Sequence, residues 1–154
     1  WEKIVQPVNI KSGYVLVYFN SPDGSCLADA KLYAERHGLA VKYINYGLPE
    51  KGTQSVKPAS LSDFFGLIKC ADAVFTASYH GMLFSLYFGR DMRFYTRCHS
   101  TRMLSLAKRL GVLDRCGDGT HGEELPAIDW PRVQARISAF RNESTDILKE
   151  MVTR

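Results

Sequence analysis

The feature that most restricts the fold is a repeated pairing of a strand-like run with a helix-like segment. Runs of apolar, β-branched and aromatic residues occur at 14–19, 39–46, 73–77 and 92–96. The first run, YVLVYF, is apolar or aromatic throughout, which is typical of a strand covered on both faces. Because strands that alternate with helices imply parallel βαβ units, we expect one Rossmann-like three-layer α/β domain over 1–154, with a parallel sheet.

The segments between these runs have the apolar spacing of helices. The clearest is 61–72, where Ser60 and Asp63 form a weak capping box. Its apolar residues recur at i, i+3, i+4 and i+7 on one helical face: Leu61, Phe64, Phe65 and Ile68. Further helices are expected up to Gly38, at 81–89, within 101–111, and from Asp129 to the end of the chain. The segments 47–60 and 115–125, rich in glycine, proline or charge, are interpreted as turns and linkers.

Composition and charge exclude several classes of protein. With 154 residues, 45% of them hydrophobic and 23% charged, the chain fits one globular domain that needs no metal or disulfide to fold. No apolar run approaches the roughly 20 residues of a membrane span, so we expect no integral membrane segment. The net charge of +4 comes from scattered residues, which suits a small anionic ligand but is not typical of a nucleic-acid-binding protein.

Motifs for common cofactors and metals do not occur. The sequence contains neither G-x-G-x-x-G nor a P-loop, so nicotinamide and nucleoside-triphosphate sites lose their main support and no cofactor is expected. The cysteines include no C-x-x-C pair, which argues against a zinc site and against a redox dithiol. Buried, reduced thiols are the preferred interpretation of all of them: Cys26, Cys70, Cys98 and Cys116.

A Ser-Tyr-His-Gly turn joins the third strand-like run to an apolar helix, in the stretch ADAVFTASYHGMLFSLYFG (71–89). Ligands of parallel α/β sheets gather at the carboxyl ends of the strands, where His80 is expected to lie. Gly81 would let the backbone N–H groups of the helix approach an anion, and His80 could donate a hydrogen bond or a proton. The alternative is that Gly81 serves backbone geometry alone and that a nearby carbonyl accepts a hydrogen bond from His80.

Other polar side chains follow neighbouring strands. Arg97, His99 and Arg102 come after the fourth strand-like run and could converge with His80 on one anion, although a solvated loop is an equal alternative. A further set follows the first run, with helix capping favoured over ligand contact: Asn20, Ser21 and Asp23.

The order of these motifs resembles the C-terminal half of the polysaccharide pyruvyl transferases. The resemblance rests on residues 57–95, with a proline-containing turn, a helix ending in Ala-Asp, a strand, the Ser-x-His-Gly turn and a Phe-Ser-containing helix in that order, and on 101–115. The opening WEKIVQP also resembles the segment that joins the two halves of that family. The family implies a two-lobed fold similar to the GT-B glycosyltransferases, and transfer of a pyruvyl group from phosphoenolpyruvate to sugar hydroxyls as a ketal.

The resemblance also implies roles for particular residues. His80 corresponds to the motif histidine of the family, as general acid or as a phosphate ligand, with Ser78 and Gly81 beside it as substrate-binding residues. Arg102 matches a basic position that opens the following helix, and Arg97 is assigned with it to the anionic donor. Position 79 is often Phe or part of an arginine-containing variant in the family but is Tyr79 here, so no arginine role carries over to it.

The resemblance further implies that the chain is one lobe of a longer cytoplasmic enzyme of surface-polysaccharide biosynthesis. It begins at Trp1 without an initiator methionine or a signal core, and a missing N-terminal lobe would complete the cleft. The acceptor would be a carbohydrate or a lipid-linked sugar, and this lobe alone would be inactive. The alternatives are a GT-B-like lobe that uses a nucleotide-sugar donor, for which residues 97–125 offer no convincing ribose-binding acid, and a non-catalytic binding module.

Overall fold

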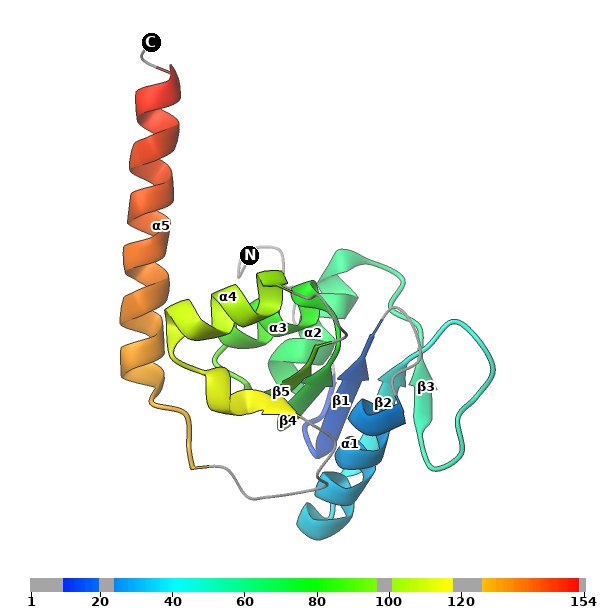
Figure 1. Ribbon diagram of the computed structural model, residues 1–154. Coiled ribbons are helices and arrows are strands. Elements are labelled where there is room, and N and C mark those ends of the chain that lie inside the picture. The colour runs from blue at the N-terminus through cyan, green and yellow to red at the C-terminus, as the bar shows by residue number, and fades with distance from the viewer. Residues whose placement is uncertain (1–9, 20–23, 97–100, 118–125, 153–154) are drawn as a thin grey trace.

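The computed structural model describes residues 10–19, 24–96, 101–117 and 126–152. Figure 1 shows a twisted sheet with helices packed against it and one long helix that extends away. The strands are β1 Tyr14–Tyr18, β2 Ala40–Ile44, β3 Gln54–Val56, β4 Ala73–Thr76, β5 Asp91–Tyr95 and β6 Cys116–Gly117. The helices are α1 Gly24–His37, α2 Leu61–Cys70, α3 Tyr79–Tyr87, α4 Thr101–Leu110, the short 3₁₀ helix η1 Leu113–Arg115, and α5 Trp130–Val152.

The sheet confirms the predicted Rossmann-like architecture. All described strand pairs are parallel, and the strand order is β3-β2-β1-β4-β5-β6. This is the order of the doubly wound Rossmann fold, in which the direction of winding reverses between the first and fourth strands. The carboxyl ends of β1 and β4 therefore form the topological switch point, the place where such sheets bind their ligands.

Helices cover both faces of the sheet, which explains why β1 is apolar throughout. Val15 and Val17 pack in a core cluster with α1 on one face. Tyr14 and Leu16 point to the other face, into a second cluster with α2, α3 and α4. The hydroxyl group of Tyr14 donates a hydrogen bond of 2.6 Å to the carbonyl of Leu67 in α2, and burial raises the pKa of this hydroxyl far above its usual value.

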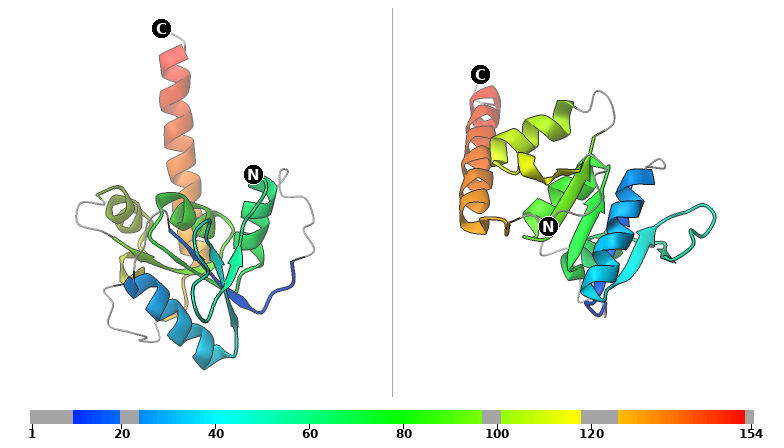
Figure 2. Two further views of the ribbon diagram at one scale, coloured as in Figure 1. Left: turned by 90° about the vertical axis from the view of Figure 1, so that its right-hand side faces the viewer. Right: turned by 60° about the horizontal axis from the view of Figure 1, so that its bottom comes forward.

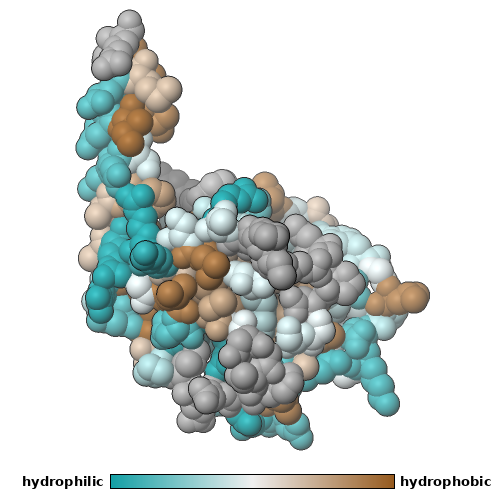
Figure 3. Space-filling view, in the orientation of Figure 1, coloured by the Kyte–Doolittle hydropathy of each residue, from teal (hydrophilic) through white to brown (hydrophobic). Residues whose placement is uncertain are grey.

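Among the described residues, helix α5 contacts the body through its N-terminal half. Val133 is its one buried residue among those the structure describes, and the helix then projects beyond α4 in the views of Figures 1 and 2. Figure 3 shows apolar residues along one side of the projecting part and hydrophilic residues along the other. The exposed apolar side chains here are Ile147, Leu148, Met151 and Val152. None of the described helices combines the length and the apolar character needed to cross a membrane.

The two edge strands lie in segments that the sequence analysis interpreted as turns and linkers. β3 falls within 47–60 and pairs with β2, and β6 falls within 115–125 and pairs with β5. That interpretation was wrong because an edge strand needs only backbone hydrogen bonds to one neighbour, and so carries no long apolar run. In β3, Gln54 and Ser55 are exposed to solvent.

The cysteine prediction is confirmed only in part. Cys26 is buried, whereas Cys70 and Cys116 are half-buried; all three are free thiols. Cys98 lies outside the described residues.

Candidate functional site

Hydrogen bonds of Thr76 join the ends of β1 and β4 at the switch point. The hydroxyl of Thr76 donates to the carbonyl of Tyr18, with 2.5 Å between the oxygens. The same hydroxyl accepts a hydrogen bond of 3.1 Å from the backbone N–H of Ser78. Thr76 is fully buried and Ser78 nearly so, so these bonds fix the path of the chain from β4 into α3.

Helix α3 begins at Tyr79, two residues before the predicted start at Gly81. Ser78 is the N-cap residue with extended backbone, and its side chain makes no capping hydrogen bond. The first helical bond runs from the N–H of Met82 to the carbonyl of Ser78, at 3.0 Å. His80 therefore lies within the first helical turn, where backbone N–H groups have no partner inside the helix and the helix dipole favours an anion.

Gly81 is required by packing. A Cβ atom at this position would lie 2.2 Å from the Thr76 hydroxyl oxygen and 3.1 Å from the Tyr18 ring. Any side chain would push α3 away from the ends of β1 and β4. The structure therefore supports the interpretation that glycine is needed at position 81 for the close approach of α3 to these strands. A contact between its N–H and a ligand stays a prediction.

The imidazole of His80 is exposed and lines a cavity of about 500 Å³ beside the switch point, here called the His80 cavity. Aromatic rings form much of its wall. Phe64 meets Tyr18 edge to face, with ring centroids 5.1 Å apart, and meets Phe84 in the same way at 6.2 Å. His80 lies one helical turn before Phe84, with nearly parallel rings whose centroids are 6.5 Å apart.

The mouth of the His80 cavity is also largely apolar. It is formed by the connection that runs from β3 into α2, and by Tyr46, whose hydroxyl donates to the carbonyl of Pro58 at 3.3 Å. Tyr46 and Leu61 are each about two-thirds exposed, at 67% and 65%. Among the described residues that line this cavity, His80 is the sole basic side chain. The cavity therefore suits a ligand with a ring or another apolar part, and one charged group near His80.

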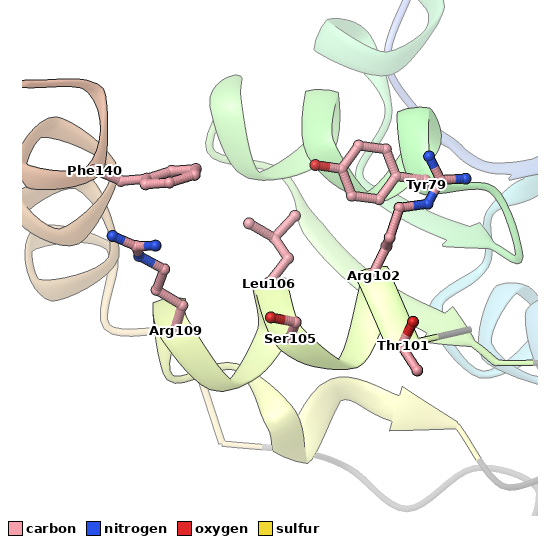
Figure 4. Close-up of a pocket in the computed structure, with 7 residues that line it drawn as sticks. All are labelled: Tyr79, Thr101, Arg102, Ser105, Leu106, Arg109 and Phe140. Carbon is pink, nitrogen blue, oxygen red and sulfur yellow. The ribbon is translucent and has the colours of Figure 1, made fainter. Parts of the chain in front are cut away.

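Arg102 lies in a different cavity from His80. It lines a space of about 400 Å³ between α3, α4 and α5, together with Tyr79 (Figure 4). Neighbouring residues of one helical turn, Tyr79 and His80, thus face two separate cavities. The predicted role of Arg102 at the donor stays a prediction. The other polar candidates lie outside the described residues: Arg97, His99, Asn20, Ser21 and Asp23.

Sequence patterns do not identify the aromatic residues that line the His80 cavity as functional. Phe64 was assigned to the core stripe of its helix, and Phe84 follows His80 at i+4, a spacing that is equally typical of core packing. Thr76 carries the one available signal, since it is a hydroxyl residue that ends an otherwise apolar strand. Tyr46 lies in a turn-rich segment that gives no indication of which strand end it covers.

A buried polar pair lies on the α1 face of the sheet. The hydroxyl of Tyr95, at the end of β5, donates to a carboxyl oxygen of Asp29 in α1 at 2.6 Å. Both side chains are at least 97% buried, with 3% and 2% exposed. Burial, and next the hydrogen bond to Asp29, raise the pKa of Tyr95 far above its usual value. The pair joins α1 to β5, and neither side chain lines the His80 cavity.

Within the described part of the chain, no group of three or more His, Cys, Asp or Glu side chains could hold a metal ion. Comparison of the chain with protein-family models, with curated proteins and with solved structures gives no match. The resemblance to the pyruvyl transferases therefore stays a prediction.

Proposed function

We propose that this domain is the donor-binding lobe of an enzyme similar to the polysaccharide pyruvyl transferases. Such an enzyme transfers a pyruvyl group from phosphoenolpyruvate to sugar hydroxyls as a ketal, in the cytoplasmic steps of surface-polysaccharide biosynthesis. The observation that carries the proposal is the position of His80, in the first turn of α3, at the switch point and facing a cavity of about 500 Å³.

The first turn of α3 offers a place for the anionic groups of phosphoenolpyruvate. Backbone N–H groups at a helix N-terminus point toward a bound anion, and the helix dipole adds to the attraction. The Ser78 hydroxyl makes no capping hydrogen bond, but Ser78 is only 5% exposed and does not line the His80 cavity, so the proposal places the anion at the backbone N–H groups. The phosphate or carboxylate of the donor would then lie next to the His80 imidazole.

In pyruvyl transfer, two acceptor hydroxyls in turn form bonds to the central carbon of the enol, and the bond from this carbon to the phosphate oxygen breaks. Of the two protons that the hydroxyls lose, one is balanced by the proton that the terminal enol carbon gains, and the other leaves with phosphate. The imidazole of His80 can deliver the proton to the enol carbon or donate a hydrogen bond to the departing phosphate. Because the aromatic walls beside His80 present flat apolar surfaces, they suit one face of a sugar ring of the carbohydrate or lipid-linked acceptor. A second lobe would complete the cleft over the exposed mouth of the cavity.

One observation favours a second candidate, a GT-B-like lobe with a nucleotide-sugar donor. The described lining of the His80 cavity holds neither arginine nor lysine, whereas its aromatic rings are typical of a surface on which a base or a sugar stacks. In this candidate the nucleotide would occupy the aromatic cavity, and the helix N-terminus would face the diphosphate.

Titration calorimetry of the 154-residue chain with phosphoenolpyruvate, and separately with uridine-diphosphate glucose, distinguishes the two candidates. We expect phosphoenolpyruvate to bind and His80→Ala to weaken it about tenfold or more, since a hydrogen bond to a charged group contributes about 1.5–3 kcal/mol. The matched control is His37→Ala, because His37 is an exposed imidazole at the C-terminal end of α1, which leads to the amino end of β2, whereas His80 lies at the carboxyl end of β4. Binding of the nucleotide sugar alone would support the second candidate, and binding that His80→Ala leaves unchanged would refute both.

A further inference from the structure

A second cavity, between α3, α4 and α5, lies outside the site described above. One face of α4 supplies Arg102, Leu106 and Arg109 at i, i+4 and i+7, so these side chains line a single wall. Tyr79 closes the cavity from α3 and Phe140 closes it from α5, as Figure 4 shows. Its volume of about 400 Å³ falls in the range of small-molecule sites, roughly 300–1,000 Å³.

Arg102 has the geometry of an anion ligand. Its guanidinium carbon lies over the Tyr79 ring, 5.3 Å from the ring centroid, a distance at which the cation is attracted to the ring. This contact leaves N–H groups of the guanidinium available for a carboxylate or a phosphate. In the part of the chain that the structure describes, no carboxylate lies within ion-pair distance of Arg102.

Arg109, at the other end of the cavity, differs from Arg102 because it already has a carboxylate partner. Its guanidinium carbon lies 4.1 Å from the centroid of the Phe140 ring, and it also forms an ion pair with Glu143 of α5. The two charged side chains are about half exposed, at 47% and 56%, and exposed pairs of this kind contribute little free energy. Arg102 is therefore the anchor for an anion, whereas Arg109 already pairs with Glu143.

The space between the two arginines is apolar. Leu106 is buried at its base, and the rings of Tyr79 and Phe140 face it from the two sides (Figure 4). Hydroxyl groups of Thr101 and Ser105 lie on the α4 wall. An inorganic anion would bind Arg102 but would make no contact with the rings of Tyr79 and Phe140, which suit an apolar part of a larger ligand.

We propose that this cavity is a second ligand site, which takes a small organic anion with a flat apolar body, such as an aryl phosphate or an aryl carboxylate. The acidic group binds the edge of the Arg102 guanidinium, and the ring lies over Leu106 between Tyr79 and Phe140. The site is independent of the proposed function, because His80 is not among the residues that line it.

The test is an NMR titration of the 154-residue chain with phenyl phosphate and, separately, with inorganic phosphate. We expect phenyl phosphate to bind more tightly than inorganic phosphate, and Arg102→Gln to weaken both by tenfold or more. Lys108→Gln is the matched control, because Lys108 is an exposed cation of α4 that does not line the cavity. Phe140→Ala should remove the preference for phenyl phosphate over inorganic phosphate.

Three outcomes would overturn the proposal: no binding of phenyl phosphate, equal loss with Arg102→Gln and Lys108→Gln, or loss with His80→Ala while Arg102→Gln binds normally. The last outcome would place the ligand in the His80 cavity, so it is distinguishable from a failure of the proposed function. Because Arg102 and Phe140 are exposed, these variants are expected to fold, and thermal unfolding checks each one.

Discussion

Replacing Gly81 with alanine tests how α3 is held against the switch point. The new Cβ would lie 2.2 Å from the hydroxyl oxygen of Thr76 and 3.0 Å from its Cβ atom. That hydroxyl cannot rotate away without losing its hydrogen bonds to Tyr18 and Ser78. Either Thr76 changes rotamer or the first turn of α3 moves outward, and both changes disturb the position of His80.

The expected cost follows from three contributions. Overpacking of a rigid site costs about 1–3 kcal/mol. Loss of the two Thr76 hydrogen bonds adds about 1 kcal/mol each, and the higher helix propensity of alanine returns up to about 1 kcal/mol. We therefore expect Gly81→Ala to lower the free energy of unfolding by about 2–4 kcal/mol.

Urea denaturation followed by far-UV circular dichroism measures this loss. The control is Gly24→Ala, also in the first turn of a helix, where a Cβ would meet no atom within 4 Å; its free energy of unfolding should stay within about 0.5 kcal/mol of the parent. In a Thr76→Ala background the clashing oxygen is gone, so Gly81→Ala should lose most of its cost. A Gly81→Ala protein as stable as its parent, or an equal cost in both backgrounds, would refute the packing argument.

The pKa of Tyr95 is higher in the folded protein than in the unfolded chain, where a tyrosine has a pKa near 10. The stabilisation by the protonated Tyr95 hydroxyl is therefore fully present below about pH 10 and is lost as the pH rises above that value. Tyr95→Phe should lower the free energy of unfolding by about 1.5–3 kcal/mol at pH 7 and flatten its fall above pH 10; an unchanged slope would contradict this. Phe65→Ala should cost about 3–5 kcal/mol in urea denaturation because Phe65 is 1% exposed, whereas Leu61→Ala, one turn earlier and 65% exposed, should cost under about 0.5 kcal/mol. Ending the chain after residue 143 removes only the projecting part of α5 and should leave the unfolding midpoint unchanged, and a clear drop would show that this part packs on the body.

The sequence predicts the central strands and the layer order because burial on both faces requires apolar residues at every position. β1 is such a strand, and β4 departs from the pattern only at Thr76. The helix at 61–70 has the predicted cap, in which the N–H of Asp63 donates to the Ser60 hydroxyl at 3.1 Å. Its predicted apolar stripe is confirmed at Phe65 and Ile68, which are buried, but not at Leu61, which is exposed. The edge strands β3 and β6 escape prediction because their stability comes from backbone pairing to one neighbour, which leaves the choice of side chains open.

The candidate site is predictable only where local chemistry defines it. The Ser-Tyr-His-Gly turn places His80 at the carboxyl end of β4, and this location is confirmed. The start of α3 at Tyr79 depends on Thr76, whose hydroxyl accepts a hydrogen bond from the N–H of Ser78, the N-cap residue. The same hydroxyl donates to Tyr18 at the end of β1, and sequence spacing does not reveal this contact between two strands. The separation of Arg102 from His80 depends on how α4 packs against α3 and α5, which sequence spacing does not specify.

The central claim is that the switch point beside His80 binds the ligand of this domain. Backbone amide shifts in a ¹H–¹⁵N NMR titration of the chain with phosphoenolpyruvate test it most directly. We expect the largest shifts in residues 78–84, which follow the carboxyl end of β4. These shifts should be absent in His80→Ala and should remain in His37→Ala. Shifts confined to the amino ends of β1 and β4, around Gly13 and Asp72, or an unchanged spectrum at a saturating concentration of phosphoenolpyruvate, would contradict it.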